Sequence, residues 1–355
     1  MNSKRLLIQT GKAVSLNVVA QHIGKVMFKY GYNVIIRRYA PEILDLSKKY
    51  DCAIYFYPFS QAFSLEKFYA YYEAKRFLKN RACFYTLADG KLKKYAIPEF
   101  VFRDLEFIAN SYYSKKKLEE IGVKVIDVVH HGYDPEEIKM SKVKAGLVHR
   151  ELRNKFKDKC ILLYISDYNI RKGLEELLNA VKILSSSRKD FVVLLHIPST
   201  AMTKIKNVEN VVVIDEFGSL SHYEIYALVQ SVDYLLYPNR VESFGLPVLE
   251  ANAVNVPVIA TKLPVFLEYT DTENNIFVDP ETILETDTAD GILYELHLVN
   301  PKDLADAIDY ALDIYFNYRS KYYDMCMKVY EKVKDMTIYN LYRKFLKYIG
   351  HEDVS

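Results

Sequence analysis

The sequence predicts an α/β protein built from two doubly wound domains, each with a parallel sheet. Continuous apolar runs of strand length alternate with longer amphipathic stretches along most of the chain, which is typical of parallel sheets covered by helices on both faces. A chain of 355 residues exceeds the size that one hydrophobic core usually supports, and half of its residues are apolar. We therefore expect two cores and two domains.

The first domain begins with a βαβ unit. Residues 4–9 have the pattern of a strand, and residues 16–30 that of a helix, which Gly31 ends because glycine tolerates the left-handed conformation found after helices. The strand 33–37 follows. Four further apolar runs complete the predicted sheet, at residues 51–57, 82–86, 107–109 and 125–129.

A polar, lysine-rich segment at residues 135–158 is predicted to join the two domains, because a second alternation of strands and helices starts directly after it. The predicted division is 1–140 for the N-terminal domain, 146–330 for the C-terminal domain and 331–355 for a last segment. The predicted elements of the second domain are strands 160–165, 191–197, 211–214 and 234–237, helices 174–184 and 223–229, and further helices from 301 to 349.

Two carboxylates, Glu242 and Glu250, lie eight positions apart across a predicted loop and helix start. Gly245 permits close approach of the backbone to a ligand, and Pro247 suits the first turn of a helix. The N–H groups at a helix start attract anions, so a phosphate fits there. Each carboxylate then accepts hydrogen bonds from a different polyol, such as a sugar and a ribose. This pattern indicates a nucleotide sugar as ligand.

The spacing resembles the E-x7-E motif of retaining GT-B glycosyltransferases, in particular the GT4 family, and the likeness extends over residues 107–280. Residues 169–174, Asn-Ile-Arg-Lys-Gly-Leu, resemble the family's phosphate-contact segment, and residues 129–134 resemble its interdomain turn. The resemblance implies the GT-B fold, with a deep cleft between two Rossmann-like domains. It also implies that the last helix, near residues 337–349, crosses back to the first domain.

The same resemblance assigns the site residues. Lys172 and Arg171 would stabilise the leaving diphosphate. Glu242 would bind the donor sugar, and Glu250 the ribose hydroxyls. Backbone contacts to the sugar and diphosphate would come from Ser243, Phe244, Gly245 and Leu246, and another from Gly11 on the first β–α turn. The family acts without a metal ion, and we expect no cofactor here besides the nucleotide sugar, which is a substrate.

The chain departs from the family pattern in its first domain and in the phosphate-contact segment. An arginine usually lies about six positions before the lysine, where this chain has Ser166, so Arg171 is the candidate replacement. A histidine common after the fourth strand of the first domain is absent, and Asp89 either replaces it or belongs to an Asp-Gly turn. His130 and His131 are interpreted as polar turn residues.

Composition bounds the partners and the location. The net charge of +2 implies no polyanionic partner, and lysines clustered at 91–94, 115–117 and 142–159 are interpreted as solvated helix faces. We find no signal peptide and no apolar run of spanning length, so a cytoplasmic protein is expected. Peripheral membrane contact stays open, because the first domain is basic and aromatic. The aromatic residues interpreted as helix core are Phe63, Phe68, Tyr69, Tyr71, Tyr72 and Phe77.

Neither cysteines nor acidic pairs indicate a metal site. The four cysteines are far apart, lack zinc-ligand spacing and suit a reducing compartment. Residues 271–273 and 287–290 resemble the Asp-x-Asp metal motif of other glycosyltransferases, but they follow the wrong strands and are interpreted as turns.

The sequence therefore predicts a transferase that moves a sugar from a nucleotide diphosphate to a hydroxyl group of a glycan, lipid or protein. One alternative is a non-catalytic sugar- or nucleotide-binding protein of the same fold, since fold does not guarantee activity. Another is a transferase acting on nucleic acid, which the lysines alone suggest and which is not the expected partner.

Overall fold

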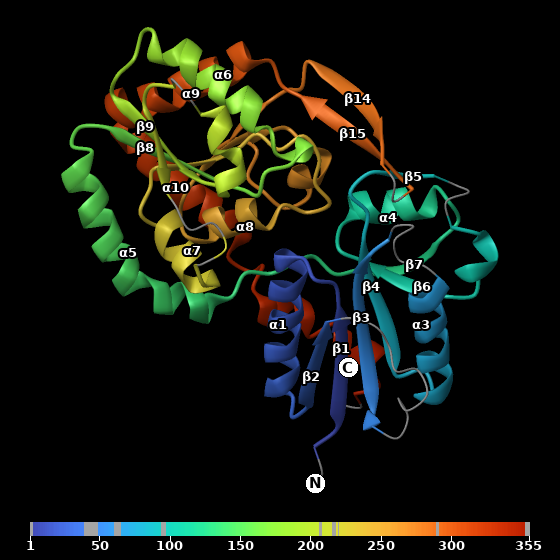
Figure 1. The fold of residues 1–355 in the computed structure, drawn as a ribbon. Helices are drawn as coiled ribbons and strands as arrows, with labels where there is room; N and C mark the ends of the chain where they lie inside the picture. Colours follow the sequence, from blue (N-terminus) through green and yellow to red (C-terminus); the bar gives the residue numbers. More distant parts are fainter. Residues whose placement is uncertain are drawn as a thin grey trace. The chain divides into compact units, whose positions relative to one another are not determined.

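The computed structural model describes residues 3–38, 49–59, 65–93, 97–205, 208–214, 218, 220–288 and 291–351. The chain forms two compact units (Figure 1). Unit 1 comprises residues 1–134, 285–294 and 336–355, and unit 2 comprises residues 135–284 and 295–335. This differs from the predicted division at residues 135–140, 285–294 and 331–335. The polar segment expected to join the domains is the long helix α5 (Pro135–Lys155) of unit 2, and residues 285–294 belong to unit 1.

Unit 1 contains a six-stranded sheet with the strand order β2-β1-β3-β4-β6-β7, and all neighbouring strands run parallel. Every strand predicted for this domain is present, with ends shifted by one residue at most. The elements of the unit are β1 (Arg5–Thr10), α1 (Val14–Lys29), β2 (Asn33–Arg38), β3 (Cys52–Pro58), α3 (Leu65–Phe77), β4 (Ala82–Leu87), β5 (Lys91–Leu92), a 3-10 helix (Glu99–Val101), β6 (Glu106–Ala109), α4 (Tyr112–Glu119), β7 (Lys124–Val128), α11 (Ile338–Tyr342) and α12 (Phe345–Tyr348).

Aromatic side chains fill both faces of the unit 1 sheet, because successive residues of a strand point to opposite sides. Tyr55 and Phe84 pack with Tyr71 of α3 on one face. On the other face Tyr85 lies edge-on to Phe345 of α12, with ring centroids 5.0 Å apart. The core interpretation of the aromatic run is confirmed for Phe68 and Tyr71. Three others of that run, Tyr69, Tyr72 and Phe77, are exposed, and Phe63 lies outside the described residues.

The turn that resembles the family's interdomain segment binds the C-terminal part of the chain. Tyr133 and Thr337 form a parallel bridge, in which the Tyr133 N–H donates to the Met336 carbonyl at 3.0 Å. A Cβ on Gly132 would lie 2.6 Å from the backbone nitrogen of Ile338, so glycine is required for this close approach. The residues from 336 on thereby belong to unit 1.

His131, in the same turn, is buried in a polar network rather than exposed as a turn residue. Its Nδ1 lies 2.8 Å from the Tyr85 hydroxyl and 3.4 Å from the Tyr342 hydroxyl, and its Nε2 faces the Asn110 amide at 3.5 Å. The Tyr85 hydroxyl also donates to the Val129 carbonyl at 2.6 Å. Burial, together with the charges of nearby histidines, lowers the pKa of His131 to about 3. The ring is therefore neutral in the folded protein at neutral pH.

This buried neutral histidine should make unit 1 sensitive to acid. The unfolded chain takes up a proton on His131 near pH 6.5 whereas the folded chain does so only near 3, so stability is complete above 6.5 and falls as pH drops. The expected loss is about 1.4 kcal/mol per pH unit below that point. Urea unfolding between about pH 7.5 and about pH 4.5 should show a shallower dependence in His131→Gln. His149 is exposed, and His149→Gln should leave the pH dependence of the free energy of unfolding as in the wild type. The same pH dependence in the wild type and both variants would contradict the prediction.

Unit 2 contains a second six-stranded parallel sheet, with the order β10-β9-β8-β11-β12-β13. Helices α6 and α9 pack on it and share one apolar core with its strands. Besides α5, its elements are β8 (Cys160–Ile165), a 3-10 helix (Ile170–Lys172), α6 (Leu174–Ser185), β9 (Phe191–His196), a 3-10 helix (Ser199–Lys204), β10 (Val211–Ile214), α7 (His222–Val229), β11 (Tyr234–Tyr237), α8 (Leu246–Ala253), β12 (Val258–Thr261), a 3-10 helix (Pro264–Glu268), β13 (Ile276–Val278), α9 (Pro301–Asn317) and α10 (Arg319–Val333).

The chain also forms a small sheet that the sequence analysis did not predict. It has the order β14-β15-β5, with β14 at Thr282–Asp287 and β15 at Ile292–Leu298. β15 pairs antiparallel with β5 through Ile292 and Leu92. The acidic residue Asp287, expected in a polar turn, therefore ends a strand, and it forms an ion pair with Lys93.

Candidate active site

The segment that carries Lys172 follows β8, at the carboxyl end of the unit 2 sheet. Residues 170–172 form a short 3-10 helix, and the Asn169 side chain caps it by accepting the Arg171 N–H at 2.9 Å. Gly173 comes next in the left-handed conformation, with φ of 66°, and starts α6. The cap and the glycine thus fix the backbone on both sides of the lysine.

This segment is bound to the loop that follows β11, the neighbouring strand of the sheet. A Cβ on Gly173 would lie 1.9 Å from the Pro238 carbonyl oxygen, so no other residue fits without displacing one of the two loops. The Arg240 N–H donates to the Arg171 carbonyl at 2.7 Å. The Arg240 guanidinium binds Glu176 on α6, with a shortest N–O distance of 2.6 Å. These contacts hold the two loops in a fixed relation.

Three hydrogen bonds converge on one oxygen of Glu242. Its Oε1 accepts from Asn239 Nδ2 at 2.6 Å, Lys172 Nζ at 2.7 Å and the Tyr237 hydroxyl at 3.0 Å. The side chain is 12% exposed. Burial acts to raise the pKa of Glu242, but the positive charges of Lys172 and Arg171 outweigh burial, so the pKa lies below its usual value. No group of the described residues donates to the second oxygen, Oε2, which leaves it available to a ligand hydroxyl.

Residues 243–246 turn the chain from Glu242 into α8. Gly245 has φ of 83°, and a Cβ there would lie 2.4 Å from the Phe266 ring. Tyr269 stacks on Phe244 with ring centroids 4.5 Å apart, and its hydroxyl lies 2.8 Å and 3.0 Å from the carbonyl oxygens of Phe244 and Gly245. The predicted backbone-contact residues therefore form one turn that a glycine and two aromatic rings support.

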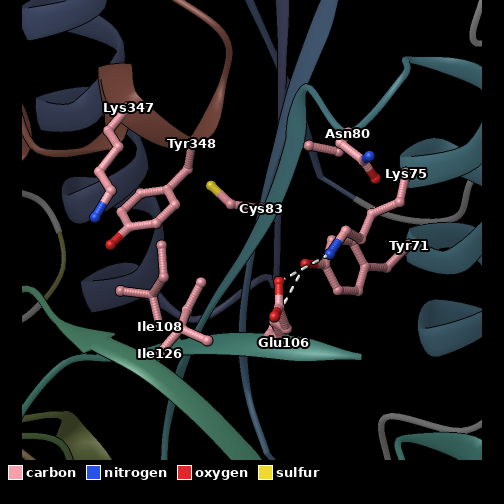
Figure 2. Close-up of a pocket in the computed structure, with 10 residues that line it drawn as sticks. Tyr71, Lys75, Asn80, Cys83, Glu106, Ile108, Ile126, Lys347 and Tyr348 are labelled. Carbon is pink, nitrogen blue, oxygen red and sulfur yellow. Dashed lines mark hydrogen bonds and ion pairs between the residues drawn. The ribbon is translucent and has the colours of Figure 1, made fainter. Parts of the chain in front are cut away.

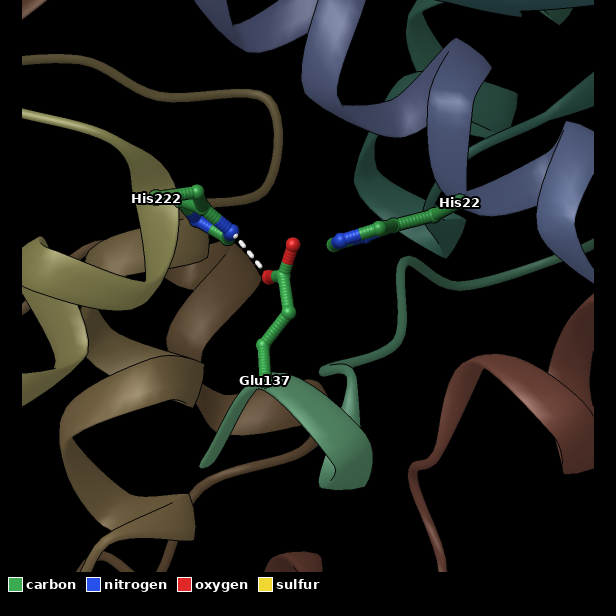
Figure 3. Close-up of side chains that lie close together, drawn as sticks. All are labelled: His22, Glu137 and His222. Carbon is green, nitrogen blue, oxygen red and sulfur yellow. Dashed lines mark hydrogen bonds and ion pairs between the residues drawn. The ribbon is translucent and has the colours of Figure 1, made fainter. Parts of the chain in front are cut away.

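Glu250, the second acid of the motif, binds a histidine that the sequence analysis did not identify. Its side chain is 8% exposed, and its Oε1 lies 2.9 Å from Nε2 of His222, the first residue of α7. The other ring nitrogen, Nδ1, lies 2.6 Å from Oε2 of Glu137, and Figure 3 shows these two side chains facing each other. Burial acts to lower the pKa of His222, but the two carboxylates raise it to about 10. His222 is therefore a cation at neutral pH.

The structure also shows how positive charge is arranged where the family arginine is missing. Ser166 is buried, and its hydroxyl lies 3.4 Å from a carboxylate oxygen of Asp167. Arg171 is half-buried, and its charge acts on Glu242, as the lowered pKa of that acid shows. Arg240 is committed to the ion pair with Glu176. Arg171 is thus the arginine of this segment whose charge reaches the first acid of the motif.

Sequence comparison places this arrangement in a family. Residues 148–325, half of the chain, match the model of the glycosyl transferases group 1. The chain belongs to this family. The matched region contains the Lys172 segment, Glu242 and Glu250, so the residues that converge in unit 2 all lie within the part that defines the family.

Known relatives and solved structures agree with the assignment. This glycosyltransferase is 26% identical over 277 residues to an uncharacterized glycosyltransferase of Sulfolobus islandicus rod-shaped virus 1, covering 76% of this chain and 79% of the viral one. A glycosyltransferase from Rickettsia africae ESF-5 has a TM-score of 0.72 at 16% identity, covering 99% of this chain and all of the other. HepE of Anabaena, solved with UDP and glucose, has a TM-score of 0.65 at 13% identity, covering 97% and 98%. The two α/β units are those of the GT-B fold.

The remaining predicted site residue, Gly11, lies in unit 1 of the glycosyltransferase. It follows β1 directly, and a Cβ there would lie 2.8 Å from the end of the Leu16 side chain. The other predicted residues, from Arg171 to Glu250, lie in unit 2. The structure therefore brings Lys172, Arg171 and Glu242 together and supports the role of Gly11 only as a turn glycine with little space beside it.

Unit 1 of the glycosyltransferase also has a pocket of about 340 Å³, drawn in Figure 2. It lies at the amino-terminal ends of β4 and β6, the edge of the sheet opposite to the strand carboxyl ends. Lys75 and Tyr71 point toward Glu106, which accepts from Lys75 at 3.3 Å through a carboxylate oxygen and from Tyr71 at 2.8 Å through its carbonyl. The polar groups in this part of the lining already bind one another.

Three further predictions can be compared with the structure of the glycosyltransferase: the lysine clusters, the membrane-spanning segments and the acidic pairs. The interpretation of the lysine clusters as solvated helix faces is confirmed only in part. Lys115 of α4 is partly exposed and pairs with Glu119, but Lys117 of the same helix is buried. Lys91 lies on strand β5, not on a helix, and pairs with Glu285. Within the described part of the chain, no helix is both long and apolar enough to cross a membrane. Asp271, in the first of the two segments that resemble the Asp-x-Asp motif, accepts the Glu273 N–H at 2.8 Å and so forms a turn, as predicted.

Proposed function

We propose that the protein transfers a sugar from a nucleotide diphosphate sugar to a hydroxyl acceptor, with retention of configuration and without a metal ion. The observation that carries this proposal is the ion pair of 2.7 Å between Lys172 and Glu242 at the carboxyl ends of the adjacent strands β8 and β11. Ligands of doubly wound sheets bind at this edge. A cation and an oriented carboxylate there match the two ends of a sugar phosphate.

Lys172 would stabilise the leaving diphosphate. Breaking the bond between the anomeric carbon and the phosphate oxygen leaves charge on that oxygen, and a fixed cation lowers the barrier by stabilising it. A diphosphate would draw Lys172 from Glu242, which keeps the Asn239 and Tyr237 hydrogen bonds and so stays oriented. The half-buried Arg171 adds a second charge on the same segment.

Glu242 and Glu250 would orient the two polyol parts of the donor. Each has one oxygen bound by protein donors, and no group of the described residues donates to the other oxygen. Ionised carboxylates accept hydrogen bonds only, so each suits the hydroxyls of a sugar or ribose. Anabaena HepE, which shares the fold, was solved with UDP and glucose, and this supports a nucleotide sugar as donor.

Retention is proposed to result from attack on the face that the leaving group occupies, with Glu242 in a binding role and not as a nucleophile. Its lowered pKa and its three donors suit a permanently ionised hydrogen-bond acceptor, and no covalent intermediate is proposed. The acceptor oxygen would attack the anomeric carbon from the face that the diphosphate leaves, and its proton would pass to the departing phosphate oxygen. The cations on the Lys172 segment would supply the charge that a divalent ion supplies in other transferases.

Calorimetric titration of UDP, GDP and ADP without added metal is the test of donor binding. We expect one nucleotide to bind the wild type, Glu250→Ala to weaken it about 10-fold or more, and Lys172→Ala to weaken it further. Lys182→Ala is the matched control, because Lys182 is an exposed lysine on α6. The anomeric configuration of the transferred sugar, read by NMR, tests retention.

Two results would contradict the proposal. If none of the nucleotides or their sugars binds, unit 2 does not hold a donor and the transferase function falls. If one binds but its sugar is neither hydrolysed nor transferred to any acceptor tried, the protein is a binding protein that uses the same fold.

A further inference from the structure

We propose that His222 is a positioning residue for donor binding, which holds the Glu250 carboxylate in the orientation that meets the ribose hydroxyls of the nucleotide. The inference rests on the proposed function, in which Glu250 binds the ribose. It adds a residue outside the E-x7-E motif, on a different helix and twenty-eight positions earlier in the chain.

Both ring nitrogens of His222 donate hydrogen bonds. Nε2 lies 2.9 Å from Glu250 Oε1, and Nδ1 lies 2.6 Å from Glu137 Oε2. An ionised carboxylate has no proton to give, so the imidazole must carry protons on both nitrogens. The ring is then an imidazolium between two carboxylates, and it makes charge-assisted bonds to both.

The position of His222 is itself fixed by α7. Ser221 caps that helix in a capping box with Glu224, whose carboxylate accepts the Ser221 N–H at 2.8 Å. Lys144 of α5 binds the same glutamate. The imidazole also lies edge-on to the Tyr226 ring, with centroids 5.0 Å apart. A side chain held at the start of a capped helix, by a ring contact and by Glu137, can orient a partner on the next helix.

Glu250 depends on this contact. Its side chain is 8% exposed, and among the described residues His222 is the one group that donates to its carboxylate. A buried carboxylate without a donor would rotate toward water or take up a proton, and either change removes an oriented acceptor. With Oε1 bound to His222, the direction of Oε2 is set before a ligand arrives. Preorganisation of this kind lowers the entropy cost of binding.

The proposal makes a prediction about the ribose alone. Calorimetry measures the dissociation constants of two forms of the nucleoside diphosphate that binds, starting with UDP. One form has the ordinary ribose and the other is the 2′,3′-dideoxy form. The quantity of interest is the dissociation constant of the dideoxy form divided by that of the ribose form. For the wild type we expect the ribose form to bind about 10-fold or more tightly. Loss of the His222 charge changes the affinity for both nucleotides by the same factor, because it acts on them through space. Partial unfolding also lowers both affinities by the same factor. Neither effect changes the ratio of the two dissociation constants.

Two variants of His222 carry the same amide group on side chains that differ in length by one methylene group. They therefore test whether the donor must reach Glu250. In His222→Asn the amide is too short to reach Glu250, and the ratio should fall close to one. In His222→Gln a longer amide can still donate, and most of the ratio should return. His149→Asn, on α5 of the same unit, is the control and should keep the wild-type ratio.

Several outcomes decide between the two proposals. A ratio that stays at the wild-type value in His222→Asn would overturn the positioning role while leaving the donor site of Lys172 intact. A wild-type ratio close to one would also overturn it, because Glu250 would then not bind the ribose. Failure of every nucleotide to bind the wild type would instead overturn the proposed function.

Discussion

Replacing Lys172 with alanine should lower kcat for sugar transfer about 10²- to 10³-fold, the scale seen when a preorganised donor to a developing negative charge is removed. The lysine lies where the diphosphate would leave, and before the donor binds its ion pair with Glu242 holds the ammonium group at this edge of the sheet. The fold should survive, because Glu242 keeps hydrogen bonds from Asn239 and Tyr237. The pKa of Glu242 should rise, since Lys172 is the largest of the influences that lower it.

The rate is measured as release of nucleoside diphosphate from the donor, with water as acceptor until a better one is found. Lys172→Arg should recover little, because a planar guanidinium does not replace a compact ammonium ion bound by one carboxylate oxygen. Lys182→Ala should be as active as the wild type. An unchanged kcat in Lys172→Ala would remove the lysine from the mechanism.

The sheets could be predicted from sequence because buried parallel strands leave a strong local signal. Strands covered on both faces must be apolar throughout, and the predicted runs 160–165 and 82–86 appear in the structure as strands 160–165 and 82–87. The segment 135–158 was harder to interpret: the two units do divide at its start, between residues 134 and 135, but residues 135–155 form a helix of unit 2 and not a linker. Only two of its residues, Ser141 and Ala145, are buried, so a long, highly charged helix has the composition of a linker.

The contact between Lys172 and Glu242 could also be predicted, because each residue belongs to a short motif after a strand. β8 and β11 are neighbours in a parallel sheet, so the loops at their carboxyl ends must meet. The glycines Gly173 and Gly245 next to these motifs agree with this arrangement. Both have positive φ, and a Cβ at either position would collide with another residue.

The partner of Glu250 could not be found this way. His222 and Glu137 lie on helices α7 and α5, and no periodicity or spacing relates them to the motif. Their meeting depends on how α7 packs against α5 and α8, which is a property of tertiary structure. The one local signal near His222 is the capping box at Ser221, which predicts the start of a helix and nothing of its chemistry.

Gly173→Ala should be among the most damaging single changes in unit 2. The residue has φ of 66°, and an added Cβ would lie 1.9 Å from the Pro238 carbonyl oxygen, which is rigid backbone. Strain and overpacking together should cost about 3 kcal/mol or more in the free energy of unfolding. The added Cβ can avoid the Pro238 carbonyl only if the Lys172 segment moves away from the loop after β11. Activity should therefore fall as well, even where the variant remains folded.

Gly218→Ala is the control variant, because it introduces the backbone strain of a positive φ without a collision. Gly218 is in the same unit with φ of 89°, but no atom of the described residues lies within 4 Å of the position of an added Cβ. It should cost only about 1 to 2 kcal/mol, the penalty for the left-handed conformation, and leave transfer unchanged. Urea unfolding and donor turnover of both variants test the difference. Equal losses of stability with full activity in Gly173→Ala would show that the contact with Pro238 does not position Lys172.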